Sequence, residues 1–265
     1  MTRLLFILLL LSSCNGNVAQ VDKSQIVSYQ TQVETSQHDS LLVNVQNKIY
    51  TAFVHGIMSK DNTKLANIRK ELGILYNKRN EKLILYWRSY LQYYSAIYYL
   101  NKGDRETSEK EIDKGIDWLK GMKKKNSEDY ALLSLLQGFG IQFKGMEAMF
   151  ISSEIKKNAN TAISLDSTNL RAYYVYASND FYTPKKYGGG KEAEKYLLKA
   201  ISLPVQKINN AYLPAWGKKE SFEMLIKLYI KQEKWDSAKK YFQKGIKEYP
   251  DSYNIKQLAS KLVGK

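Results

Sequence analysis

Apolar residues recur at helical spacing along most of the chain, in segments separated by short polar breaks. The clearest example is the stretch 220–250. Apolar positions there form one face of a first segment, four polar residues interrupt it, and a second amphipathic segment follows. Pro250 closes the stretch, because a helix cannot continue through proline. Two short helices joined so tightly lie antiparallel and cannot bury their inner face alone. The pattern therefore predicts a unit that stacks on similar neighbours.

This stretch resembles the tetratricopeptide repeat, a helix pair with a period of about 34 residues. With Tyr229 on the aromatic position of the first helix, the other family positions fall on Phe222, Leu225, Ala238, Phe242, Gly245 and Pro250. Ile226 departs from the family pattern, which prefers a small residue there. The stretches 81–122 and 170–203 match the same pattern. In the first of them Gln92 takes the place of the usual bulky residue.

The remaining segments also have helical periodicity, and no clear alternation of period two is present. The sequence therefore predicts an all-α fold. By resemblance to the repeat family, we expect a right-handed superhelix of about eleven helices over residues 39–265. The segment 252–263 has one apolar edge and several lysines, so it is predicted to cap the end of the superhelix.

The chain begins with the segment 1–14, MTRLLFILLLLSSC. One cation precedes an apolar run that has the length of a signal-peptide core and is too short to cross a bilayer. Its end resembles the bacterial lipobox, in which cleavage precedes a cysteine that then carries lipid. Cys14 is the only cysteine of the chain and stands where that motif requires one. The alternative is an ordinary secretory signal that is cut further on, after Ala19.

The lipobox divides the chain into a signal peptide at 1–13, a polar tether at 14–38 and the repeat domain at 39–265. Cys14 is then the lipidation site. The residue after it, Asn15, is not the aspartate that favours inner-membrane retention in well-studied Gram-negative systems. By that resemblance we expect a lipid-anchored envelope protein at the outer membrane, facing the periplasm.

Two connections are longer than the repeat needs. The loop 182–190 contains three consecutive glycines, and Gly190-Lys191 resembles part of a phosphate-binding loop. It lacks the preceding strand, the first glycine and the Ser or Thr of that motif, so a structural turn is the preferred interpretation. The connection 204–217 is unusually long for a compact helical domain, and we expect it to line a rim or contact a partner.

The sequence offers little for catalysis. The only histidines are His38 and His55, and no metal-ligand spacing or nucleophile motif is present. We therefore expect no enzyme activity, no cofactor and no metal. The formal net charge is +15, but export makes nucleic acid an improbable partner. Anionic lipid, acidic polysaccharide or an acidic protein surface would fit this charge, and so would a plain solvated helical surface.

Two functions remain open. The first is a scaffold that holds a protein or peptide in its concave groove; the second is a transport accessory that binds a small ligand in a helical cavity. The glycines near Gly138 and the loop 182–190 favour the second if they bound a real cavity. The family's inner-face positions, carried over to this chain, give the candidate binding residues Tyr90, Tyr93, Arg171, Tyr174, Ser178, Phe181, Tyr182, Lys227 and Lys231. We expect this groove to hold an extended or C-terminal peptide with acidic and apolar residues.

Overall fold

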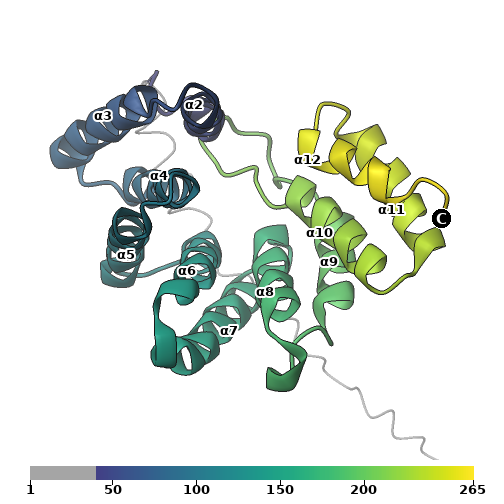
Figure 1. The fold of residues 1–265 in the computed structure, drawn as a ribbon. Coiled ribbons are helices and arrows are strands. Elements are labelled where there is room, and N and C mark those ends of the chain that lie inside the picture. Colours follow the sequence, from purple (N-terminus) through teal and green to yellow (C-terminus); the bar gives the residue numbers. More distant parts are fainter. Residues whose placement is uncertain (1–39) are drawn as a thin grey trace, which may run out of the picture.

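The computed structural model describes residues 40–265, and in that part all regular structure is helical (Figure 1). This confirms the predicted all-α fold. The described part contains eleven α-helices: α2 Val45–Ser59, α3 Thr63–Arg79, α4 Lys82–Asn101, α5 Arg105–Gly121, α6 Ser127–Gly140, α7 Ala148–Leu165, α8 Leu170–Tyr182, α9 Ala193–Ser202, α10 Lys218–Lys231, α11 Trp235–Glu248 and α12 Tyr253–Lys256. Short 3-10 turns accompany them at Ile141–Phe143, Gly145–Glu147, Lys185–Tyr187 and Gln257–Lys261.

The helices pack as consecutive antiparallel pairs, α2 with α3, α4 with α5, α6 with α7, α8 with α9 and α10 with α11. The first helix of each pair also packs on the first helix of the next pair. Figure 1 shows the result, an arc in which α2, α4, α6, α8 and α10 lie on the inner side. The chain therefore has the predicted helical-repeat architecture.

Small residues allow the two helices of a pair to approach closely, as the repeat register requires. Gly115 on α5 is buried, and a Cβ added there would lie 2.8 Å from Leu136 Cδ2 and 3.1 Å from Gln92 Cβ. Ser108, one turn from the start of α5, donates a hydrogen bond of 2.7 Å to the carbonyl of Ala96 on α4. Larger residues at these positions would push α4, α5 and α6 apart.

Two helix ends have distinctive local structure. Asn126 precedes α6 and caps it: its side chain accepts from the amide of Asp129, and the Asp129 carboxylate accepts from the amide of Asn126. This is a reciprocal cap. At the other end of the chain, α12 is only four residues long and continues as a 3-10 turn at Gln257–Lys261. It still covers the last pair, since Ile255 and Leu258 pack on Phe222.

The glycine-rich loop is closed by its own residues. The Asp180 carboxylate at the end of α8 accepts hydrogen bonds from the amides of Glu192 and Ala193, at 2.9 and 2.8 Å. These are the amides at the start of α9 that an anion would need. Gly190 also donates to the carbonyl of Asp180. The loop is therefore a turn, and the amides at the start of α9 donate to the Asp180 carboxylate.

The glycines of α6 pack against neighbours or face open space. A Cβ at Gly140 would lie 3.4 Å from Ile116 Cδ1, and a Cβ at Gly138 would have no atom within 4 Å. Gly145 has a φ of +49° in the turn before α7. Close helix packing thus accounts for Gly140, and a turn accounts for Gly145.

Candidate functional site

Aromatic side chains from several inner helices meet on the inner side of the arc. We call this surface the aromatic face and define it by Tyr50, Phe53, Tyr90, Tyr93, Tyr94, Phe139, Phe143, Tyr174 and Trp216. Ring contacts connect these residues without a break, from α2 through α4 to α6 and through Trp216 to α8. The rings therefore form one continuous cluster from four helices, a 3-10 turn and one loop, in which Tyr90, Tyr174 and Trp216 are buried.

Tyr93 and Tyr94 lie at the centre of the aromatic face, on α4. Both side chains are half-buried. The Tyr94 ring is 5.0 Å from Phe53 on α2, and the Tyr93 ring is 5.6 Å from Phe139 on α6. The first pair of rings is tilted and the second is edge-to-face, and such contacts favour fixed ring positions. Two flat apolar surfaces with hydroxyl tips are thus presented on the inner side of the arc.

The connection between α9 and α10, residues 203–217, crosses the arc and joins its two limbs. We call it the bridge. It touches the first pair of helices: Asn44 donates to the carbonyl of Ala211 at 2.9 Å, and Ala215 donates to Gln46 Oε1 at 2.7 Å. On α4, Trp87 Nε1 donates to the carbonyl of Tyr212 at 3.0 Å. Residues more than a hundred positions apart in the sequence are therefore held together by the bridge.

Trp216 anchors the end of the bridge. It is 4% exposed, and its Nε1 donates a 2.9 Å hydrogen bond to the Tyr86 hydroxyl. Its ring lies 6.3 Å from Tyr90 on α4 and 6.1 Å from Tyr174 on α8. The next residue, Gly217, has a φ of +105°, and a Cβ there would lie 2.8 Å from Leu170 Cδ1. Glycine is required at this position both for its backbone angle and for space.

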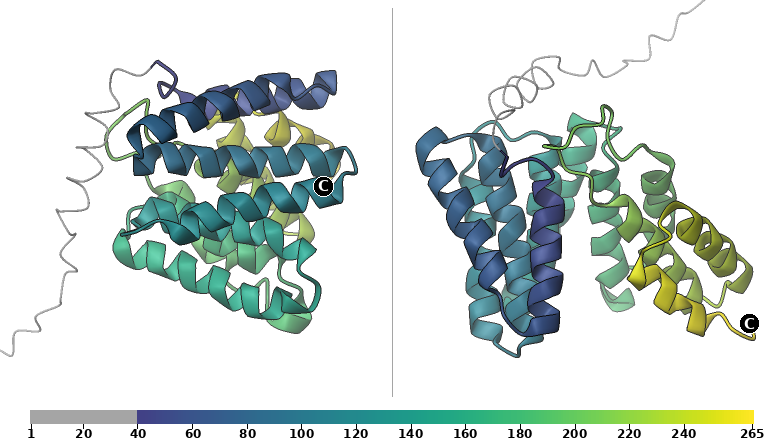
Figure 2. Two further views of the ribbon diagram at one scale, coloured as in Figure 1. Left: turned by 90° about the vertical axis from the view of Figure 1, so that its left-hand side faces the viewer. Right: turned by 90° about the horizontal axis from the view of Figure 1, so that it is seen from above.

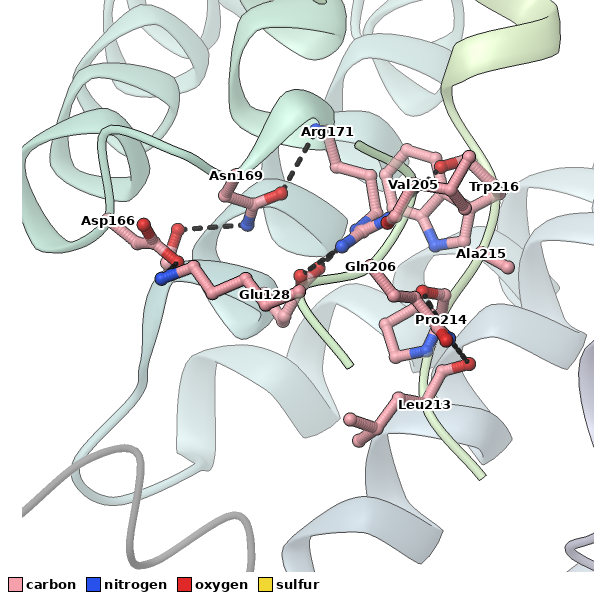
Figure 3. Close-up of polar contacts among 12 residues, drawn as sticks. Glu128, Asp166, Asn169, Arg171, Val205, Gln206, Leu213, Pro214, Ala215 and Trp216 are labelled. Carbon is pink, nitrogen blue, oxygen red and sulfur yellow. Dashed lines mark hydrogen bonds and ion pairs between the residues drawn. The ribbon is translucent and has the colours of Figure 1, made fainter. Parts of the chain in front are cut away.

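Arg171 fixes both ends of the bridge to the helices (Figure 3). Its guanidinium donates to both oxygens of Glu128 on α6, at 2.6 and 2.5 Å, and to the carbonyls of Val205 and Trp216. Arg171 is 5% exposed. A bidentate pair of this kind is strongly directional. Within the bridge, Gln206 Nε2 donates to the carbonyls of Leu213 and Pro214, which folds the loop on itself.

Two carboxylates of α10 lie beside the aromatic face. Glu220 is half-buried; its Oε2 accepts from the amide of Gly217 at 2.7 Å, and the nearest ammonium, that of Lys219, is 3.9 Å away. Glu223 is paired with Lys227 and accepts from Asn254. Burial raises the pKa of Tyr93 and of Tyr94, and the negative charge of Glu220 is the next largest cause for both. The centre of the face thus lies in the field of a carboxylate.

The predicted binding residues fall into two groups in the structure. Tyr90, Arg171 and Tyr174 are buried, and Arg171 is fully engaged with Glu128 and the bridge. Their side chains support the inner surface from beneath and offer little area to a partner. The reason is the bridge, which covers the starts of α4 and α8.

The other predicted residues reach solvent. Tyr93, Ser178 and Phe181 are half-buried, and Tyr182 is 68% exposed. Lys227 is paired with Glu223, while the Lys231 ammonium lies over the Phe181 ring at 5.4 Å. These residues come from α4, α8 and α10, which the arc brings to its inner side.

Sequence reasoning missed several members of the aromatic face: Tyr50, Phe53, Tyr94, Phe139, Phe143 and Trp216. Tyr94 adjoins a residue that was assigned to the groove, and its helix is crowded with aromatic residues. Trp216 carried a weaker signal, since a tryptophan next to a glycine in a long loop is unusual. Its contacts with α4 and α8 had no signature in the local sequence.

Two open depressions lie elsewhere on the surface. One, of about 800 Å³, is between α2 and α3 and is lined by Asn47, Thr51 and Asn67, among others. The second, of about 560 Å³, runs along α7 beside Lys156 and Asn160. Neither is an enclosed apolar cavity of the kind that a small ligand would need.

Residues 40–265 contain neither a metal site nor a membrane-spanning helix. No group of histidine, cysteine and acidic side chains in this part could hold a metal ion. None of the described helices is long and apolar enough to cross a membrane. Cys14, the predicted lipidation site, and the predicted tether to residue 38 lie outside the described residues.

The fold and this inner surface define a helical-repeat protein with an aromatic concave face. Neither a family model nor a curated protein matches the chain. Among solved structures, the chain is similar to NprR in complex with its cognate peptide NprX. The identity is 17%, over 91% of this chain and 77% of that chain, with a TM-score of 0.30. At this identity and this TM-score, neither a fold nor a ligand is inferred for the chain from NprR.

Proposed function

We propose that this chain is an interaction scaffold that binds a peptide, or an extended segment of a protein, on its aromatic face. The observation that carries the proposal is that Tyr93 and Tyr94 are only half-buried, so part of each ring is open to a partner. Both lie on the inner side of the arc, in contact with rings from α2 and α6. A hydroxyl on a rigid ring supplies apolar area and a hydrogen-bonding tip with little loss of side-chain entropy.

The shape of the surface favours an extended ligand over a small molecule. The half-buried and exposed rings of the aromatic face come from α2, α4, α6 and the turn after α6, and Phe181, Tyr182 and Lys231 extend this area toward the ends of α8 and α10. A small ligand would instead be surrounded on most sides by one pocket. The two depressions described above are open and lie away from this face, so no observation favours the transport function.

The proposal includes attachment to the cell envelope through a lipid on Cys14. Its support is the sequence alone, namely the apolar run, the lipobox-like end and the single cysteine. We expect Cys14→Ala to abolish labelling by palmitate and to release the domain or leave the precursor uncleaved. Labelling that survives this substitution would contradict the lipid anchor and would leave the binding proposal unaffected.

Photo-crosslinking tests the binding proposal. A photoreactive amino acid replaces Tyr182, at the rim of the inner side, or Tyr253, which is 71% exposed on α12 and serves as the matched control. We expect crosslinks to a defined partner from position 182 and none from position 253. Adding Tyr93→Ala to the first variant should remove them. Equal crosslinking from both positions, or crosslinks that persist with Tyr93→Ala, would contradict the proposal.

A further inference from the structure

The bridge closes one edge of the inner surface. The inner helices all start at the same edge, and the bridge contacts lie at those starts: Asn44 and Gln46 on α2, Trp87 on α4 and Arg171 on α8. Trp216 lies buried among them. We call this the bridge edge. A chain lying along the aromatic face cannot continue past it, because a packed and hydrogen-bonded segment occupies that end.

The opposite edge has no such closure in the described part of the chain. There each inner helix turns into its partner, and the turns leave large side chains exposed, such as Met58 at 81%, Met146 at 96% and Tyr182 at 68%. We call this the turn edge. Figure 2 shows in its right-hand view that α2 and α10 meet the bridge at one end and lie farther apart toward the other. A ligand must therefore reach the aromatic face from the turn edge.

Charge is not spread evenly between the two edges. Glu220 is in the first turn of α10, at the bridge edge, and within the described part of the chain its Oε1 has only the ammonium of Lys219 nearby, at 3.9 Å. That ammonium lies over the Tyr50 ring, 4.9 Å from its centre. Lys227, which is paired with Glu223, and Lys231 lie in the later turns of α10, toward the turn edge. The closed end of the face therefore has a carboxylate with spare hydrogen-bonding capacity and one ammonium beside it, and Lys231 stands toward the open end.

We propose that the aromatic face takes the free amino end of a peptide, inserted from the turn edge, with its ammonium at the Glu220 carboxylate. This inference rests on the proposed function, since it names the ligand of that same face. An internal segment would need both edges open. A C-terminal carboxylate would meet the negative charge of Glu220 at the closed end, and like charges repel strongly where water is scarce. The peptide's later residues would pass Lys231, which suits acidic side chains, whereas Lys227 is already paired with Glu223.

This inference changes the ligand expected from the sequence. The sequence suggested an extended or C-terminal peptide with acidic and apolar residues, and Arg171, Lys227 and Lys231 were the cations available for its acidic groups. In the structure Arg171 is committed to Glu128 and the bridge, and Lys227 to Glu223. Acidic side chains remain suitable near the turn edge, but the end of the peptide that enters the face is the amino end.

Peptide arrays test the inference. Short random peptides are attached through their C-terminus with a free amino end, in the same way with an acetylated amino end, or through the amino end with a free C-terminus. We expect the tightest binding in the first format. Acetylation should weaken it by about tenfold or more, the effect of losing one charge-assisted hydrogen bond.

Charge-removing variants locate the ammonium. Glu220→Gln keeps an oxygen that can accept from the Gly217 amide, and it should abolish the advantage of the free amino end. Glu223→Gln should have a smaller effect, because that carboxylate is already paired. Glu106→Gln, on an exposed part of α5, is the matched control and should change nothing.

The outcomes separate the two proposals. If acetylated peptides or peptides with a free C-terminus bind equally well to the native chain, the face binds peptides but the amino-end inference is wrong. If Glu220→Gln retains the full effect of acetylation, the ammonium does not sit there. If no peptide binds in any format, the proposed function falls together with the inference.

Discussion

The two edges of the superhelix are built differently although the same helices reach both. At the bridge edge, Trp216 and Arg171 are buried, and hydrogen bonds join the bridge to α2, α4 and α8. At the turn edge, Met58, Met146 and Tyr182 are exposed. Packing and polar contacts thus concentrate where the arc must be held at fixed width. The other edge keeps its apolar and aromatic side chains available to a ligand.

This comparison predicts that large effects on stability come from the bridge edge. Trp216→Ala removes a buried ring and its hydrogen bond to Tyr86, so it should lower the free energy of unfolding by about 3–5 kcal/mol. Tyr187 lies in a turn, and its ring is 70% exposed. Tyr187→Ala should therefore change the free energy of unfolding by less than about 0.5 kcal/mol. Urea unfolding of both variants measures the difference. A similar loss of unfolding free energy in both variants would mean that the bridge does not stabilise the arc of helices.

The ion pair beneath the bridge should have the next largest effect. Arg171→Met leaves the Glu128 carboxylate without its partner in a mostly buried place, and we expect a loss of about 3 kcal/mol. The double variant with Glu128→Leu should recover part of that loss, since it no longer leaves a lone charge. Lys110→Met, which breaks a solvent-exposed pair on α5, is the control and should leave the free energy of unfolding nearly unchanged. Equal effects for Arg171→Met and Lys110→Met would contradict the assignment.

The helix pairs themselves predict a medium effect that is independent of either edge. Ala238 on α11 is fully buried where the last two long helices meet. Ala238→Leu should overpack this contact and cost about 1–3 kcal/mol, measured by thermal unfolding. Ala259→Leu, on the half-buried terminal turn, should cost less. An unchanged melting temperature for Ala238→Leu would mean that the repeat register is wrong.

The last prediction concerns two aspartates whose pKa values are shifted in opposite directions. Burial raises the pKa of Asp129, near the bridge edge, to about 6, whereas hydrogen bonds from Thr107 lower the pKa of Asp104 at the turn edge. Because the folded pKa of Asp129 is raised, its contribution to stability falls as pH rises from about 4 to about 6. Because the folded pKa of Asp104 is lowered, its contribution is lost as pH falls through the acid range.

Asparagine substitutions separate these two contributions. Asp129→Asn should gain stability relative to the native chain as the pH rises from about 4 to about 6. Asp104→Asn should lose relative stability as the pH rises from the acid range to neutrality. Unfolding at a series of pH values measures both. A flat difference for Asp129→Asn would show that this carboxylate stays ionised throughout.

Much of the fold could be predicted because it is local. The spacing that placed Tyr229, Ala238 and Gly245 in one register also set the helix pairs, and every such pair forms from residues close in sequence. The loop 182–190 was also readable, since the missing motif residues argued against a phosphate site. Helix ends were less predictable: the predicted terminal segment 252–263 is α-helical only at Tyr253–Lys256 and continues as a 3-10 turn at Gln257–Lys261.

The aromatic face could be predicted only in part. The repeat register brought Tyr93 and Tyr182 to the inner side, but it could not show that the bridge would cover Arg171 and Tyr174. That covering depends on contacts such as Trp87 with Tyr212 and Trp216 with Tyr86, whose partners are far apart in the sequence. No periodicity records such a contact, since it arises from the curvature of the whole arc.

The most direct test of the central claim is the affinity of a bound peptide for three forms of the protein. A peptide selected on the array is titrated by calorimetry against the native chain, Tyr93→Ala and Tyr253→Ala. Our account predicts that Tyr93→Ala weakens binding by about tenfold to a hundredfold, as the loss of a central aromatic residue does in other interfaces, while Tyr253→Ala leaves it unchanged. Equal affinity for all three forms would show that the peptide does not bind on the aromatic face.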